Sequence, residues 1–156
     1  MVFIEKYSPI WQQEASYLSV REEQAQFTIG NIPQVVEQLK ETEHPHLIIF
    51  EDKPVGFFLL DLDYSTKYQF GSQKAIGIRA LLVDQHYQGK GIATKVIKAL
   101  PSYVAKHYPD FEVMQLTVNC RNKPAYECYL KCGFADTGEL YLGGPVGPQH
   151  IMQYVL

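Results

Sequence analysis

The segment from residue 78 to residue 93 constrains the fold more than any other part of the sequence. It reads Ile-Arg-Ala-Leu-Leu-Val-Asp-Gln-His-Tyr-Gln-Gly-Lys-Gly-Ile-Ala, an apolar run followed by a polar loop with two glycines and an amphipathic stretch. This order predicts a strand, a glycine loop and the start of a helix. The first N–H groups of a helix lack partners inside it, and the helix dipole favours an anion there. The loop therefore predicts a phosphate-binding site.

Two widespread phosphate-binding motifs do not match this loop. A P-loop has four residues between its first glycine and its Gly-Lys pair and a Ser or Thr after the Lys, whereas positions 84 and 91 hold Asp and Gly. The dinucleotide-binding fingerprint needs a third glycine where position 94 is Thr. An ordinary glycine-rich turn into a helix gives the same pattern, so the interpretation needs a second motif.

The length and composition of the chain are those of a single globular domain, which we expect to span residues 1–156. No run of 18 apolar residues and no signal peptide are found, so we expect no membrane association. Cys120, Cys128 and Cys132 show no CxxC spacing, which argues against a metal site and favours reduced thiols in the cytoplasm. The net charge of −3, without a basic cluster, argues against nucleic-acid binding.

The hydrophobic pattern predicts an α/β (α+β) chain in the order βααβββαβαββ. Asn31 is expected to cap the second helix, and the region 64–74 is expected to be a loop. Antiparallel pairing is expected early in the chain and a βαβ crossover in the middle. The predicted strands span 3–7, 46–50, 55–62, 75–83, 112–118, 133–139 and 150–156, and the predicted helices span 11–26, 31–40, 92–107 and 124–131.

A second motif lies in residues 116–134, which read Leu-Thr-Val-Asn-Cys-Arg-Asn-Lys-Pro-Ala-Tyr-Glu-Cys-Tyr-Leu-Lys-Cys-Gly-Phe. Asn122 is expected to cap a helix that Gly133 ends. Tyr129 lies seven residues after Asn122, two helical turns on and nearly on the same face. An aromatic residue at this spacing fits the core of the protein, but it also fits a side chain that faces the ligand of the glycine loop.

Together the two segments resemble the GNAT superfamily of acyl-CoA-dependent N-acetyltransferases. The family's loop, Gln/Arg-x-x-Gly-x-Gly/Ala, is similar to the stretch from Gln88 to Ala93, and a common bacterial form aligns from Val83 onward. The later family motif, Asn-x-x-Ala-x-x-x-Tyr-x-x-x-Gly-Phe, is matched from Asn122 to Phe134. The resemblance is clear over 46–156. It implies a mixed, mostly antiparallel sheet flanked by helices, whose fourth and fifth strands splay to admit the cofactor.

The resemblance also implies the cosubstrate acetyl-CoA and the residues that hold it. The pantetheine arm is expected to pair with the fourth strand at Leu81, Leu82 and Val83, and a backbone N–H near Leu82 or Val83 is expected to point at the thioester oxygen. Asn122 resembles the residue that hydrogen-bonds the far end of the arm. The diphosphate is expected on the backbone N–H groups of Gln88, Gly89, Lys90, Gly91, Ile92, Ala93 and Thr94.

Tyr129 resembles the family's general acid, which protonates the thiolate leaving group. The attacking amine must also lose a proton, because alkyl amines have a pKa near ~10.4. The sequence does not identify the base, and a water chain would serve equally well. His150 is expected to be structural. The candidate bases by residue type are Glu22, Glu23, His46, Asp61 and His86.

The acceptor is expected to be a small polyamine-like cation. Glu22, Glu23 and Phe27 combine carboxylates with an aromatic ring, as a site for an organic cation would. This segment faintly resembles bacterial diamine and polyamine acetyltransferases. A drug or amino-sugar amine and a protein amine stay open as acceptors, and so does a non-catalytic acyl-CoA-binding module. We expect a monomer or a homodimer.

Overall fold

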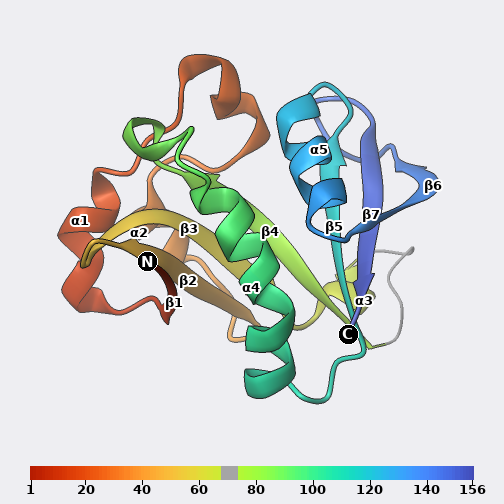
Figure 1. The fold of residues 1–156 in the computed structure, drawn as a ribbon, viewed down its shortest axis with the longest axis horizontal. Helices are drawn as coiled ribbons and strands as arrows, with labels where there is room; N and C mark the ends of the chain where they lie inside the picture. Colours follow the sequence, from red (N-terminus) through yellow and green to blue (C-terminus); the bar gives the residue numbers. More distant parts are fainter. Residues whose placement is uncertain (68–73) are drawn as a thin grey trace.

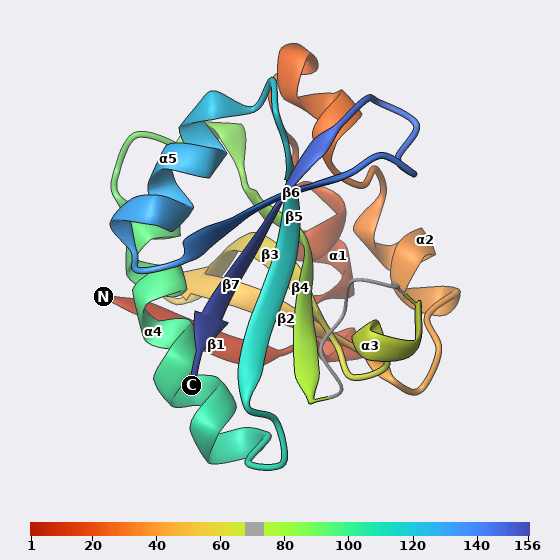
Figure 2. The same cartoon turned by 90° about the vertical axis from the view of Figure 1, so that its right-hand side faces the viewer.

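The computed structural model describes residues 1–67 and 74–156, and a seven-stranded sheet runs through them with helices on both faces (Figures 1 and 2). The strand order is β1-β2-β3-β4-β5-β7-β6, and neighbours are antiparallel except β4 and β5. The expected mixed, mostly antiparallel sheet is confirmed. The strands are β1 (Val2–Lys6), β2 (Glu43–Phe50), β3 (Lys53–Asp61), β4 (Ala75–Val83), β5 (Val113–Asn119), β6 (Ala135–Tyr141) and β7 (Gln149–Val155).

The sheet divides the hydrophobic core into two parts, one on each face. Helices cover both faces (Figure 2). On one face, α4 (Ile92–His107) buries Val96, Leu100 and Val104 at helical spacing, beside α5 (Lys123–Lys131). On the other face, α1 (Gln12–Ser16) and α2 (Ile32–Glu37) pack Ala15 and Ile32 onto the sheet. Because helices cover both faces, the sheet is the framework that positions the functional residues.

The sheet opens between β4 and β5 (Figure 1). The two strands pair only where Ala75–Gly77 lies beside Val113–Gln115, so the later half of β4 is not hydrogen-bonded to β5. A register shift against β3 coincides with Ala80, whose φ of 57° is unusual for a residue with a side chain. The expected splay of the fourth and fifth strands is therefore confirmed, and a bulge accompanies it.

The long helix predicted over residues 11–26 is wrong. The segment contains the 3-10 helix η1 (Pro9–Trp11), the short α1 and the 3-10 helix η2 (Glu22–Phe27). The break falls at Ser19, whose backbone N–H donates to Asp84 Oδ1 at 2.9 Å and whose carbonyl accepts from the Gln85 N–H at 2.7 Å. These contacts use the backbone groups that a continuous helix would have needed.

The caps of α2 and α5 differ from one another. Asn31 accepts from the backbone N–H of Gln34 at 3.1 Å, so the predicted cap of α2 is confirmed. Asn122 stands at the cap position of α5, but its side chain makes no capping hydrogen bond, so the predicted side-chain cap is wrong. Gly133 ends α5 with φ 99°, and β6 therefore begins two residues later than predicted.

The predicted loop at residues 64–74 begins with a helical turn, α3 (Tyr64–Lys67). The Tyr64 ring packs against Gly77, where a Cβ would lie 2.0 Å from the ring. Gly77 thus allows α3 to approach β4 closely. The part of this predicted loop at 68–73 lies outside the described residues.

Candidate active site

The glycine loop joins the end of β4 to α4, and both glycines have left-handed backbone conformations. Gly89 has φ 79° and Gly91 has φ 77°, angles that glycine adopts without steric cost. A Cβ at either position would meet no atom within 4 Å. Gly91 is the residue before the first turn of α4, whose leading N–H groups lack helical partners. The predicted strand, glycine loop and helix are confirmed, and an anion can approach the backbone there.

The start of this loop is fixed by Asp84, which is buried. Its Oδ1 accepts from the backbone N–H of Ser19, and its Oδ2 accepts from the backbone N–H of His86 at 3.2 Å. The Gln85 side chain adds a hydrogen bond to Ser19 Oγ at 2.9 Å. The loop is therefore tied to a segment more than sixty residues earlier in the chain.

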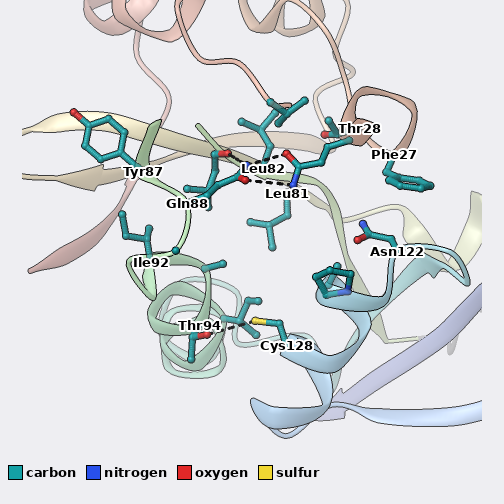
Figure 3. A pocket seen from close by; sticks show the side chains of 18 of the residues that line it. Phe27, Thr28, Leu81, Leu82, Tyr87, Gln88, Ile92, Thr94, Asn122 and Cys128 are labelled. Carbon is teal, nitrogen blue, oxygen red and sulfur yellow. Dashed lines mark hydrogen bonds between the residues drawn. The ribbon is translucent and has the colours of Figure 1, made fainter. Parts of the chain in front are cut away.

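A cavity of about 390 Å³ lies between the glycine loop, the end of β4 and the N-terminal half of α5 (Figure 3). Figure 3 shows Gln88 and Ile92 on one side of it and Asn122 and Cys128 on the other. Leu81 and Leu82 form the wall where β4 has left β5. The predicted cofactor residues in its wall are Leu81, Leu82, Val83, Gln88, Gly89, Gly91, Ile92, Ala93, Thr94 and Asn122.

Tyr129 lies on the first cavity's α5 side, where its ring packs edge-on against Phe134 with the centroids 5.5 Å apart. Only 8% of Tyr129 is exposed, and burial raises the pKa of its hydroxyl well above the ordinary value. Within 1–67 and 74–156 no group hydrogen-bonds this hydroxyl. The phenol is therefore protonated at neutral pH and available as a donor.

A second cavity, of about 490 Å³, lies on the other side of Tyr129. It reaches from α2 and β2 to the bend at Gly143–Val146, and both Glu43 and Arg79 line it. Arg79 Nη1 donates to Glu43 Oε2 at 2.7 Å and to Asp61 Oδ2 at 3.1 Å. The two cavities share six wall residues: Phe27, Thr28, Leu81, Asn122, Ala125 and Tyr129.

Three predicted site residues lie outside both cavity walls. Lys90 is exposed in the glycine loop, and Glu22 and Glu23 are exposed on η2. Phe27, on the same short helix, lines both cavities, with the Arg121 guanidinium carbon 5.9 Å from its ring centroid. The structure thus brings Phe27 to the site without its two acidic neighbours.

The other candidate bases also lie outside the two cavity walls. His46 is fully buried, its Nε2 is 2.9 Å from Tyr103 Oη, and burial lowers its pKa to about 4. Asp61 is buried against Arg79. His86 is exposed and its Nδ1 lies 3.0 Å from Asp84 Oδ2. His150, on β7, is partly exposed and packs on Tyr126 of α5 with 4.2 Å between the ring centroids.

Several wall residues have no signal in the sequence. Gln24 lines the first cavity and pairs with Gln88, while Glu43 and Arg79 line the second. Cys128, treated as an ordinary thiol, also lines the first cavity, 3.5 Å from Thr94 Oγ1. Of these residues, only Cys128 could have been predicted from the sequence as part of the cavity wall, because it lies one turn after Ala125 on the predicted helix and next to Tyr129.

Two other kinds of feature are absent from the described residues. Among residues 1–67 and 74–156 no group of three or more His, Cys, Asp or Glu side chains is arranged to hold a metal ion. No helix in the same two ranges has the length and apolar character needed to cross a bilayer.

Known proteins are similar to this chain over most of its length. The family model described as Acetyltransferase (GNAT) family matches residues 3–134. The uncharacterized N-acetyltransferase YbbJ of Bacillus subtilis is 33% identical over 114 residues, 72% of this chain and 71% of YbbJ. A probable spermine N(1)-acetyltransferase of Bacillus subtilis subsp. natto is 30% identical over 113 residues, 70% of this chain and 72% of that protein.

A solved structure extends the likeness of the fold over nearly the whole chain. The aminoglycoside acetyltransferase AAC(6′)-Ib in complex with coenzyme A and kanamycin superposes with a TM-score of 0.78 at 20% identity. The alignment covers 99% of this chain and 95% of that one.

Proposed function

The chain belongs to the GNAT family of acetyltransferases, and we propose that it transfers the acetyl group of acetyl-CoA to a primary amine held in the second cavity. One observation carries this proposal. Tyr129 stands in the wall shared by both cavities, so one phenol borders the space for each substrate. From the remaining wall residues we assign the first cavity to the cosubstrate and the second cavity to the amine.

The first cavity fits acetyl-CoA on two structural grounds. The open space around Gly89 and Gly91 leaves backbone N–H groups accessible to a diphosphate, with Lys90 nearby as a positive charge. The stretch from Leu81 to Val83 is not hydrogen-bonded to β5, so it can pair with the amide-rich arm of the cosubstrate. We assign Asn122, opposite on α5, to the far end of the arm.

Acetyl-CoA supplies the acetyl group as a thioester, and its leaving group is a thiolate. We assign the protonation of that thiolate to Tyr129. The Tyr129 hydroxyl holds its proton at neutral pH, and its place in the wall of both cavities lets it donate that proton as the thiolate forms. Acid catalysis of this kind contributes roughly 10²–10⁴-fold to the rate.

We propose that a chain of water molecules accepts the proton that the incoming amine loses. Among the described residues in the wall of the second cavity, Glu43 is the only carboxylate. Its Oε1 accepts from the backbone N–H of Lys40 at 2.9 Å, and its Oε2 accepts from Arg79. A carboxylate with both oxygens hydrogen-bonded is a weak base, so Glu43 is better suited to orienting water or the acceptor.

A small polyamine-like cation is the acceptor class that we propose. Its support is the likeness to a probable spermine N(1)-acetyltransferase and the presence of Glu43 and Phe27 in the wall of the second cavity. Glu22 and Glu23 would act from the outer rim of η2 as charges that attract a polycation. An amino-sugar amine is the second candidate, because the fold is similar to that of an aminoglycoside acetyltransferase.

The test measures release of the free thiol from acetyl-CoA with spermine, spermidine, kanamycin and a lysine-containing peptide as acceptors. We expect release with spermine or spermidine and a singly acetylated product by mass spectrometry. Release with kanamycin alone would overturn the polyamine assignment. Tight coenzyme A binding with no release for any amine would instead indicate a non-catalytic acyl-CoA-binding module.

We also propose that residues 1–156 form a single acetyltransferase domain that works in the cytoplasm. One sheet includes strands from both ends of the described chain, which supports a single domain. The three cysteines are free, which supports a reducing compartment.

A further inference from the structure

The side chains of Gln24 and Gln88 form a reciprocal pair of amide hydrogen bonds. Gln88 Nε2 donates to Gln24 Oε1 at 3.0 Å, and Gln24 Nε2 donates to Gln88 Oε1 at 3.3 Å. The two residues are 64 positions apart in the sequence, and both line the first cavity. Gln88 stands directly before the glycines of the loop (Figure 3).

The pair ties together three parts of the cavity wall. Gln88 Nε2 also donates to the carbonyl of Val83 at 2.9 Å, so both of its amide hydrogens are used. Gln24 Oε1 also accepts from the backbone N–H of Arg21 at 3.0 Å, which fixes the Gln24 side chain to the start of η2. The side chain of Gln88 therefore joins the end of β4, the glycine loop and η2.

Gln88 is the last residue of the loop that a described side-chain contact holds in place before α4 begins. Asp84 and Gln85 fix the earlier part through Ser19. Gly89 and Gly91 have no side chains, and glycine backbones lose the most conformational freedom when a ligand orders them. An anchor at Gln88 lowers that entropic cost, because the backbone entering the glycines is already oriented.

We propose that Gln24 is a positioning residue for coenzyme A, acting through Gln88 to hold the glycine loop ready to bind the diphosphate. The inference rests on the proposed function, in which the first cavity takes acetyl-CoA. The same short helix that carries Gln24 also carries Phe27, which lines the second cavity. Gln24 thus also links the segment beside the acceptor to the loop that holds the cosubstrate.

The first experiment replaces Gln24 with methionine, which keeps the length of the side chain and removes both the carbonyl and the NH₂ of its amide. Calorimetry with coenzyme A should show about tenfold weaker binding, which corresponds to the loss of one or two hydrogen bonds. Gln34→Met, a matched change at an exposed glutamine of α2, should leave the affinity for coenzyme A unchanged. Equal affinity of Gln24→Met and the wild type would overturn the proposal.

A second experiment replaces the two glutamines with a charged pair, which separates positioning of the glycine loop from a purely structural effect. Gln24→Glu alone cannot donate to Gln88 Oε1 and should weaken coenzyme A binding, whereas Gln24→Glu combined with Gln88→Arg restores the link as an ion pair. We expect the double variant to recover most of the affinity. A double variant that binds no better than Gln24→Glu would overturn the proposal, even if Gln24→Met failed to fold.

A further variant distinguishes a failure of the proposal for Gln24 from a failure of the proposed function. Gly91→Ala changes the glycine loop itself and leaves the Gln24–Gln88 pair in place. A wild-type protein that does not bind coenzyme A, or a Gly91→Ala variant that binds it normally, contradicts the assignment of the first cavity. Weak binding by Gly91→Ala with normal binding by Gln24→Met contradicts only the role of Gln24.

Discussion

Tyr129 on α5 and Leu81 on β4 both stand in the wall of each cavity, one from either side of the split between β4 and β5. Few other residues border both cavities. Because Tyr129 lies between the two substrates, changes there should affect the chemical step more than the binding of either substrate. The first prediction follows from this position.

Tyr129→Phe should lower kcat about 100-fold or more and change the dissociation constant of coenzyme A less than about twofold. The hydroxyl makes no hydrogen bond to the described residues, so its removal should leave the melting temperature nearly unchanged. Steady-state thiol release and calorimetry with coenzyme A measure the two effects. An unchanged kcat would remove Tyr129 from the mechanism.

The matched control is Tyr126→Phe on the same helix. Tyr126 donates to Asp136 Oδ2 at 2.7 Å and lines neither cavity. This change should lower stability slightly through the lost hydrogen bond while leaving kcat intact. A large fall in kcat for Tyr126→Phe would show that damage to α5, and not the Tyr129 hydroxyl, limits turnover.

Gly91→Ala should weaken coenzyme A binding about tenfold or more. The new methyl group meets no protein atom and would extend into the space that we assign to the diphosphate, and the φ of 77° adds strain of about 1–2 kcal/mol. Gly138→Ala supplies the control, because Gly138 has φ 84° and similar open space but lies on β6.

Both glycine variants should therefore be destabilised to a similar extent in urea, and only Gly91→Ala should lose affinity for coenzyme A. Equal affinities of the two variants for coenzyme A would mean that the loop does not contact the cosubstrate.

Coenzyme A should protect Cys128 from alkylation by a maleimide. Cys128 lines the first cavity, whereas Cys120 is partly exposed outside both cavity walls and should react at the same rate with or without coenzyme A. Peptide mass spectrometry distinguishes the two thiols within one sample. Protection of neither thiol at saturating coenzyme A would place the cosubstrate elsewhere on the molecule.

The stability of the protein should fall as the pH falls from about 6.5 to about 4, in part because of His46. The pKa of His46 is lowered from 6.5 to about 4 in the folded protein, so the unfolded chain takes up the proton first. The contribution of His46 is therefore complete above pH ~6.5, is lost progressively below it and levels off below pH ~4. It amounts to about 3 kcal/mol.

Urea unfolding at several pH values from about 7 to about 4 measures this dependence. His46→Gln should show a shallower decline than the wild type, whatever its stability at neutral pH. Parallel curves for the wild type and His46→Gln would contradict the prediction.

The sequence was sufficient where the relevant interactions are local. The strand, glycine loop and helix around Gly91, and the helix that carries Tyr129, depend on residue order within about twenty positions. The failed helix at residues 11–26 depends instead on Asp84, which holds the Ser19 backbone from a distance of 65 residues. No periodicity in the first segment could reveal that contact.

The wall of the second cavity could not be predicted for the same reason. Glu43 and Arg79 are 36 positions apart in the chain. They come together because β2 pairs with β3 and β3 pairs with β4. The exposed carboxylates of Glu22 and Glu23 matched the chemistry of a cation site, but the orientation of a six-residue 3-10 helix is set by tertiary contacts.

The gap in the sheet has a consequence for how tolerant the protein is to change. Its width depends on where the ladder between β4 and β5 stops, at Gly77 and Gln115, and on the bulge at Ala80. We expect insertions or deletions in the surface connections to leave that ladder in place. The width of the gap would then stay set by backbone register, while the segments outside the sheet that line the second cavity could be rebuilt around it.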